Sequence, residues 1–382
     1  MKFAHLGDCH LGGWRQPELR ELNFKSFQYA IDKCIKENVK FIIIAGDLFD
    51  SAYPSIETLK EAFKEFRKLK EHNIPAFVIA GSHDYSVSGK TFLEVLEKAG
   101  FCANIASFEE RNGQLLLFPT IYENIAFYGY PGRKSGLEIQ DIERLKLIDS
   151  PGLFRILVLH TTIKDAVKNP QIKAIDQEKL PNIDYIALGH LHIDYIKENL
   201  AYSGPTFPNN ISELAELNYG SFCIYENRRI RKEFIKLKGV LYKVIEVKDG
   251  LIATDEIISL LEKEDVSDKI IILRLMGIIE KGKLSDINFQ KIESYLKKRG
   301  AYVLLKSTSK LHSLEPEIKI DLGDAQTMEN QIIKRFEENH PSKYNSLIES
   351  LIKTLQIEKL EDEKSAVFEE RLLTEARRIL QT

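Results

Sequence analysis

Short apolar runs alternate with amphipathic stretches over the first hundred residues. Each apolar run is rich in residues that favour β-strands and ends in a polar turn, after which apolar residues recur at helical spacing. Because strands that alternate with helices usually pair in parallel, this pattern predicts an α/β fold whose sheet is covered by helices on both faces. The predicted strands are KFAHL, KFIIIAG and PAFVIAG, and the predicted helices span about 18–38, 55–72 and 91–99.

The pattern changes twice further along the chain. The first predicted domain, 1–238, continues with more apolar runs and one further helix, at 137–148. Residues 239–320 alternate strands with helices and predict a smaller α+β domain. Residues 321–382 carry apolar residues at helical spacing only, which predicts a helical segment. The apolar faces of this segment rest either on the rest of the chain or on another protein.

Composition narrows the class of partner. The 54 lysines and arginines nearly balance the 57 aspartates and glutamates, so a polyanion would have to bind local patches or a metal. The densest basic run, 228–238, is typical of a solvated edge strand, although it could also follow a phosphate backbone. Four scattered cysteines without a CxxC pair argue against disulfides and thiolate zinc sites. With no apolar run of roughly 18 residues, we expect a cytoplasmic protein without membrane contact.

Side chains that can bind metals follow the ends of five predicted strands, and five of the nine histidines are among them. The carboxyl ends of neighbouring strands share one edge of an open α/β sheet, so we expect these side chains to converge there. The candidate residues are Asp8, His10, Asp47, His83, Asp84, His160, His190 and His192.

Carboxylates and imidazoles without thiolates suit manganese, iron or zinc, and a bridging carboxylate permits two ions about 3.5 to 4 Å apart. Side chains at positions i and i+2 of an extended segment point the same way. The DxH and HxH spacings therefore let both members of each pair reach one cluster. Two such ions would bind an attacking water and the oxygens of a phosphate, which predicts metal-assisted hydrolysis of a phosphoester.

The order of the motifs DCH, GDLFD, GSHD, LH and GHLH resembles that of the calcineurin-like metallophosphoesterase superfamily. MKFAHLGDCHLG, IIIAGDLFDSAYPS and YIALGHLH followed by YSGP are similar to its archaeal SbcD-type branch, the nuclease subunit of a double-strand-break repair complex. The resemblance covers roughly residues 1–210. It implies an α/β metallophosphoesterase sheet core flanked by helices, a smaller α+β cap domain and a C-terminal helical segment.

The resemblance also implies roles for individual residues. His83 would stabilise charge that develops on the phosphate or leaving oxygen, and Asp84 would orient its imidazole. Where the family usually has asparagine, this chain has Ser82, whose hydroxyl reaches about 1.5 Å less. We therefore expect the second ion to be held more weakly than the first. The implied ligands of two manganese ions are Asp8, His10 and His192 for the first, His160 and His190 for the second, and Asp47 as the bridge. Ser82 stands at the position of a further ligand of the second ion, where either its hydroxyl binds after a shift of the backbone or a water fills the gap.

The function that this resemblance implies is a manganese-dependent DNA exonuclease or endonuclease acting in double-strand-break repair. Its implied partners are DNA, a second copy of the chain in a homodimer, and an SMC-like ABC ATPase bound by the C-terminal helices. Two alternatives stay open: a phosphodiesterase of small substrates, and a DNA-end-binding scaffold whose catalysis is weakened by Ser82. The sequence does not identify the residues that contact DNA.

Overall fold

The computed structural model describes residues 1–86, 89–133, 136–167, 169, 171–313, 333–334, 337, 342, 344–357, 359 and 365–380. These residues belong to two compact units, Met1–His312 and Ser313–Thr382, and each unit is described by itself. Every described helix is too short or too polar to cross a lipid bilayer.

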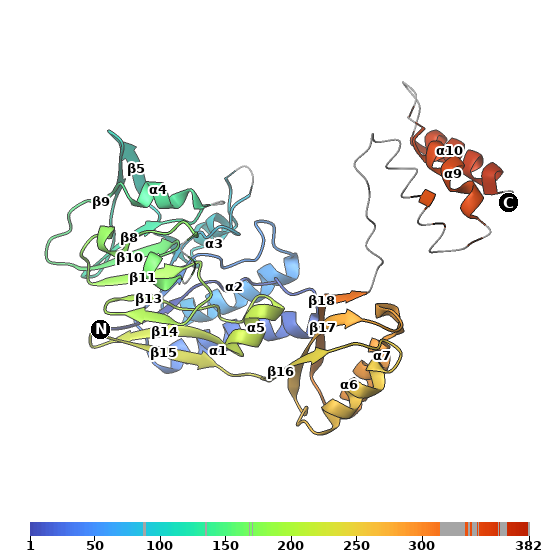
Figure 1. The fold of residues 1–382 in the computed structure, drawn as a ribbon. Helices are drawn as coiled ribbons and strands as arrows, with labels where there is room; N and C mark the ends of the chain where they lie inside the picture. Colours follow the sequence, from blue (N-terminus) through green and yellow to red (C-terminus); the bar gives the residue numbers. More distant parts are fainter. Residues whose placement is uncertain are drawn as a thin grey trace. The chain divides into compact units, whose positions relative to one another are not determined.

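The first sheet has six strands and contains the three strands predicted in the first hundred residues. Its strand order is β15-β14-β1-β2-β3-β4. Two of its strands, β14 and β15, are labelled in Figure 1. Parallel pairing joins β1 (Lys2–Leu6), β2 (Ile42–Ala45), β3 (Ala76–Ile79) and β4 (Ala103–Asn104). β14 (Gly220–Glu226) pairs antiparallel both with β1 and with β15 (Arg229–Ile235).

A second six-stranded sheet has the order β12-β13-β11-β10-β8-β7, so the prediction of one main sheet is wrong. Local patterns predict strands but not which strand pairs with which, because pairing depends on contacts between distant residues. The central parallel strands are β8 (Ile125–Tyr130), β10 (Phe154–His160), β11 (Tyr185–Gly189) and β13 (Leu200–Tyr202), with β7 (Thr120–Tyr122) and β12 (Tyr195–Lys197) antiparallel at the edges.

The two sheets pack face to face over a buried apolar core. In β2, Ile43 packs against the other sheet, whereas Ile42 and Ile44 face the helices, because side chains alternate along a strand. In β10 the same alternation sends Val158 between the sheets and Leu159 to the outer face. Strands buried on both faces are continuously apolar, which explains why the sequence shows runs rather than alternation.

Helices cover only the outer face of each of the two sheets, so the prediction of helices on both faces is wrong: the inner face packs on the other sheet. Phe27 of α1 (Pro17–Lys36) and Phe66 of α2 (Ile56–Glu71) pack on the outer face of the first sheet. The helix predicted at 137–148 is only partly confirmed: α4 (Glu138–Ile142) is followed by a strand, β9 (Leu145–Leu147). Pairing with β6 satisfies the backbone of β9 and overrides its helical spacing. The other elements here are α3 (Leu93–Lys98), β5 (Phe108–Arg111), β6 (Gln114–Leu117), η2 (Lys164–Ala166), η3 (Gln177–Lys179) and α5 (Ile211–Leu217).

A three-stranded sheet of order β16-β17-β18 follows within the same compact unit, as the predicted α+β region. One face of this sheet packs on two helices, and its other face packs on the start of the chain near Trp14. The elements are β16 (Gly239–Glu246), α6 (Ala253–Glu262), β17 (Lys269–Ile279), η4 (Leu284–Asp286), α7 (Phe289–Lys298) and β18 (Val303–Ser313).

The second unit contains the predicted helical segment. Its described elements are η5 (Asn345–Leu347), α9 (Ile348–Leu355) and α10 (Ser365–Leu380), and α9 packs against α10. Most of the predicted segment before residue 344 lies outside the described residues.

Candidate metal centre

The carboxyl ends of both sheets meet at one place. Asp8 and Asp47 follow β1 and β2 of the first sheet, whereas His160 ends β10 of the second. Hydrogen bonds join the two sheets directly: the His190 backbone N–H donates to Asp8 Oδ1 at 2.8 Å, and His160 Nδ1 lies 2.9 Å from Ala45 O. The residues predicted to converge therefore do so at an edge that two sheets share.

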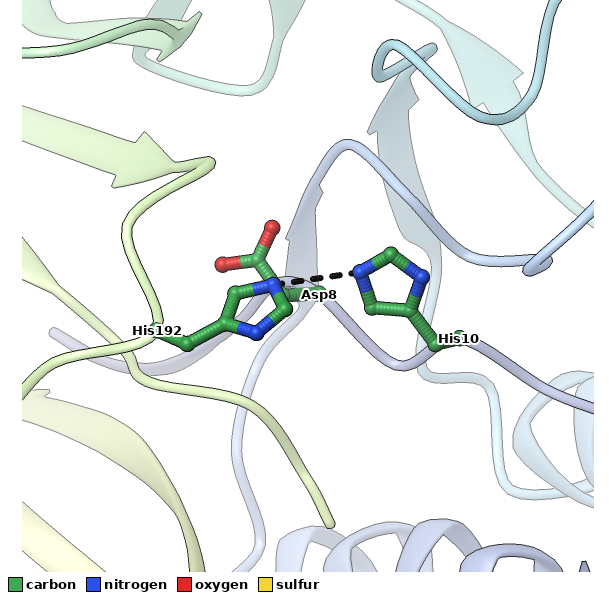
Figure 2. Close-up of side chains that lie close together, drawn as sticks. All are labelled: Asp8, His10 and His192. Atoms are coloured by element: carbon green, nitrogen blue, oxygen red, sulfur yellow. Dashed lines mark hydrogen bonds between the residues drawn. The ribbon is translucent and has the colours of Figure 1, made fainter. Parts of the chain in front are cut away.

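Asp8, His10 and His192 form the first cluster, in which one ligand atom from each lies within 4.8 Å of the others. Figure 2 shows the two imidazoles facing each other beside the Asp8 carboxylate, and their Nε2 atoms are 3.1 Å apart. Asp8 and His10 are buried, and His192 is half-buried. The sequence-predicted ligands of the first ion are thus brought together.

Asp8, Asp47 and His160 form the second cluster at the same spacing. Asp47 Oδ2 lies 3.2 Å from His160 Nε2 and 3.7 Å from His10 Nε2, so its carboxylate stands between the two clusters. The exposed His190 ring has its centre 5.0 Å from that of His160, and Ser82 Oγ donates to Asp47 Oδ2 at 3.4 Å. His190 and Ser82 border the second cluster, although the three-residue groups found among the described residues leave them out.

The two imidazoles of the first cluster are held by carboxylates that the sequence analysis did not predict. Asp50 Oδ1 lies 3.1 Å from His10 Nδ1, and Glu213 Oε2 lies 2.8 Å from His192 Nδ1. A carboxylate on Nδ1 keeps the proton there and leaves Nε2 free to bind a metal. Asp50 is the last letter of GDLFD, so it could have been found in that motif. Glu213 lies on α5, outside every motif.

The donor set fits a divalent cation. With their protons on Nδ1, both facing Nε2 atoms carry lone pairs, and two lone pairs 3.1 Å apart repel unless a proton or cation lies between them. The buried Asp8 Oδ2 has no hydrogen-bond partner among the described residues, although buried carboxylate oxygens are normally paired. Oxygen and imidazole ligands without thiolates suit manganese, iron or zinc.

Electrostatics at the second cluster favour a positive charge. Burial by itself lowers the pKa of His160, but Asp47, together with Asp8 and the carbonyl of Ala45, acts in the opposite direction and raises the pKa to about 10. Burial also raises the pKa of Asp8. The raised pKa of Asp8 indicates that this buried carboxylate is short of compensating positive charge, which a bound cation would supply.

Backbone conformation at the centre is strained. Four of the candidate residues have positive φ angles, which non-glycine residues rarely adopt. These angles are 51° at Asp8, 42° at His10, 49° at Asp47 and 95° at His190. Such strain persists where surrounding contacts fix it, and it is typical of functional sites. At Gly46, φ is 85° and a Cβ atom would lie 2.2 Å from His160 Nδ1, so only glycine fits there.

The predicted role of Asp84 needs correction. Its buried carboxylate accepts backbone N–H groups of Phe49 at 3.0 Å, Gly81 at 2.9 Å and Leu48 at 3.3 Å. His83 Nδ1 instead lies 2.9 Å from the backbone oxygen of Asp50. Asp84 therefore fixes the loops after β2 and β3, and it does not orient the imidazole of His83, because three convergent donors occupy its oxygens.

A cleft of about 680 Å³ opens beside the centre. Its lining includes His83 and His190 together with Ser82, Tyr53 and Arg133. His83 is exposed there, which leaves its imidazole accessible to a ligand in the cleft. The cleft thus gives a substrate access to His83 and to His190 and Ser82, which border the second cluster.

Two packed sheets whose strand ends converge on aspartate and histidine define a metal-dependent phosphoesterase. Residues 1–194 match the family of calcineurin-like phosphoesterases, and the chain belongs to this family. Among its curated relatives are two archaeal proteins, each called "DNA double-strand break repair protein Mre11". That of Archaeoglobus fulgidus is 28% identical over 269 residues, which cover 65% of this chain and 59% of the relative. That of Methanosarcina acetivorans is 28% identical over 333 residues, which cover 83% of this chain and 52% of the relative.

The chain therefore spans about half the length of the curated relatives that it matches. A solved structure described as "Structural and Functional Characterization of a Novel Archaeal Phosphodiesterase" is 12% identical and covers 61% of this chain and 99% of its own, with a TM-score of 0.30. The family assignment rests on the family match alone.

Proposed function

We propose that the chain is a manganese-dependent DNA nuclease that hydrolyses phosphodiesters in double-strand-break repair. The observation that carries the proposal is the pair of adjacent Asp/His clusters beside an open cleft. The family match supports phosphoester hydrolysis. The relatives named for double-strand-break repair support DNA as the substrate.

Two manganese ions would supply an activated water and neutralise charge on the phosphate. From its exposed position on the cleft, His83 would donate a hydrogen bond to the phosphate or leaving oxygen, with the Asp50 carbonyl orienting its ring. Asp50 and Glu213 contact Nδ1 of His10 and His192, and Asp8 and Asp47 are buried. These contacts would hold the ligand side chains in position before the substrate binds. The first ion would be held by Asp8, His10 and His192, the second by His160, His190 and Ser82, and both by Asp47.

Ser82 motivates the second candidate, a DNA-end-binding scaffold with weakened catalysis. Its hydroxyl donates to Asp47 Oδ2, so it makes this contact at the bridge instead of presenting an amide oxygen to an ion. Against this candidate, each of the other implied ligands is present and at the centre.

We further propose a cytoplasmic homodimer that binds an SMC-like ABC ATPase through its C-terminal helices. Within the second unit, α9 and α10 expose large apolar side chains at Leu355, Val367 and Leu373, which are 62%, 53% and 53% exposed. Exposed apolar side chains on amphipathic helices are typical of surfaces that dock in a hydrophobic groove of a partner.

The test compares the wild type with His83→Ala, in manganese, on labelled DNA and on bis-p-nitrophenyl phosphate. We expect the wild type to cleave DNA and the variant to lose at least about a hundredfold in rate while binding DNA equally well. His72→Ala, at an exposed histidine on the far end of α2, is the matched control and should behave like the wild type. Hydrolysis of the small ester alone would favour a small-substrate phosphodiesterase. A wild type no faster than His83→Ala would favour the scaffold.

A further inference from the structure

Asn209 joins the two carboxylates that hold the imidazoles of the first cluster. Its side-chain Nδ2 donates to Asp50 Oδ1 at 3.0 Å, on the carboxylate that contacts His10. Its backbone N–H donates to Glu213 Oε2 at 2.8 Å, on the carboxylate that contacts His192. One residue outside the motifs therefore touches the supports of both imidazoles.

The segment that carries Asn209 is fixed from both ends. Before it, the buried Trp14 donates from Nε1 to Pro208 O at 2.8 Å. After it, Asn210 caps α5, because its Oδ1 accepts the backbone N–H of Glu213 at 3.0 Å. The backbone of Gly13 also approaches so closely that a Cβ atom there would lie 2.4 Å from Asn209 Oδ1. Trp14 is thus a structural anchor of this segment.

The same segment rests on the α+β cap region. Trp14, Phe207 and Leu214 share one buried apolar cluster with side chains of β17 and β18. Ile272 of β17 is fully buried in this cluster. Its neighbour Ile271 is equally buried but faces the other way, into the cap's own core with α6 and α7. Packing of the cap therefore reaches the residues on both sides of Asn209.

We infer that Asn209 is a positioning residue that sets the affinity of the first metal ion, and that cap packing acts on this ion through residues 207–213. The inference rests on the proposed metal-dependent function. Residues that orient metal-binding histidines contribute to metal affinity because an imidazole free to rotate loses its alignment. A residue that does not bind the ion can thus change the affinity of that ion through the orientation of its ligands.

The second cluster provides an internal comparison. His160 Nδ1 lies 2.9 Å from the backbone oxygen of Ala45 in β2, so its orientation depends on the first sheet and not on Asn209. Loss of Asn209 should therefore weaken the first ion and leave the second unchanged. A general loss of folding would weaken both.

The experiment is calorimetric titration of the full chain with manganese. His10→Ala, which removes a ligand of the first cluster, identifies which of the two binding events belongs to the first ion. We expect Asn209→Ala to weaken that event about 10- to 100-fold and to leave the other within twofold of the wild type. We expect Ile272→Ala to weaken the same event severalfold. Ile271→Ala, on the same strand at equal burial, should change neither. Where an alanine variant does not fold, Ile272→Val and Ile271→Val replace the pair.

Long-range ¹⁵N–¹H spectra of the metal-free protein give a readout that altered stability does not move. In the wild type, Nδ1 of His10 and Nδ1 of His192 should both carry a proton, with one further proton between the two Nε2 atoms, and in Asn209→Ala at least one of the Nδ1 protons should be only partly present. Unchanged affinity and spectra in Asn209→Ala would overturn the inference, as would equal weakening of both ions. If Ile272→Ala and Ile271→Ala weakened manganese binding equally, the inference that cap packing acts on the first ion would be overturned. A wild type that binds no manganese would instead overturn the proposed function.

Discussion

Ser82 is the residue at which this chain departs from the pattern that its motifs otherwise follow. Its hydroxyl donates to Asp47 Oδ2 at 3.4 Å, and it lines the cleft. An asparagine at this position would extend an amide oxygen about 1.5 Å further. We therefore expect this single side chain to determine how many ligands a second ion would receive.

Ser82→Asn should tighten the weaker manganese site about tenfold, which is about 1.4 kcal/mol, because it supplies an amide oxygen as a further ligand. Calorimetric titration of the two sites measures the change. Ser82→Ala is the matched control. Its manganese affinity at the weaker site should equal that of the wild type if the Ser82 hydroxyl does not bind the ion. Equal and tight sites in the wild type would contradict the prediction.

At this scale the sequence predicts some residues and misses others for a physical reason. The ligands lie directly after apolar strands, and their types alone suit a metal, so position and chemistry together predict Asp8 or His160. Asn209 and Glu213 lie after YSGP, the last motif, in a segment before and on α5 that has no pattern of metal-binding residues. They meet the centre only because the chain returns to it, and no local pattern marks that return.

Among the elements, the loops after β2 and β3 depend on one carboxylate. Asp84 is 1% exposed and accepts N–H groups from both loops. Burial raises its pKa to about 6, with the nearby Asp47 carboxylate contributing, and the backbone N–H groups act in the opposite direction. The loops that carry Asp47 and Ser82 are thereby held at a fixed separation.

Asp84→Ala should lower the free energy of unfolding of the metal-free protein by about 3 kcal/mol, because it leaves buried N–H groups without an acceptor. Urea unfolding followed by fluorescence of Trp14, the only tryptophan, measures this in the first unit. His83→Ala, at the exposed neighbour, should change stability by less than about 0.5 kcal/mol. Similar losses in both variants would show that Asp84 does not hold the loops.

Elements with strong helical spacing were predictable within a few residues. Apolar residues on α1 and α2 face the first sheet at that spacing, and the structure confirms both helices. The sequence is less informative at 145–147, where a short segment with the same apolar content pairs as β9. Three residues are too few to show a period, so pairing with β6 determines that this segment forms a strand.

For the molecule as a whole, the important departure from expectation is the second sheet. His5 of β1 is fully buried between the sheets, and its Nδ1 lies 2.9 Å from the hydroxyl of Tyr185 in β11. Burial lowers the pKa of His5 to about 3, and the charge of Lys232 acts in the same direction. An uncharged histidine thus contributes to the contact between the sheets.

His5 should make folding sensitive to acid. In the unfolded chain its pKa returns to 6.5, so the unfolded state binds more protons between pH 6.5 and about 3. Stability contributed by the neutral ring is complete above pH 6.5 and falls by about 1.4 kcal/mol per pH unit below it, or about 2 kcal/mol at pH 5. In urea unfolding with EDTA, the change in stability from pH 7 to pH 5 should be less favourable by about 2 kcal/mol in the wild type than in His5→Gln, which cannot titrate at this position. Parallel losses in both proteins would exclude His5 as the cause.

The edge that the two sheets share has a consequence for biosynthesis. The ligands of the first cluster emerge from the ribosome between Asp8 and His192, and the carboxylate that holds His192 follows at Glu213. A nascent chain that ends before His192 therefore lacks one of the three groups of that cluster, however well its first sheet has formed. Translation itself withholds the complete cluster until His192 has been added.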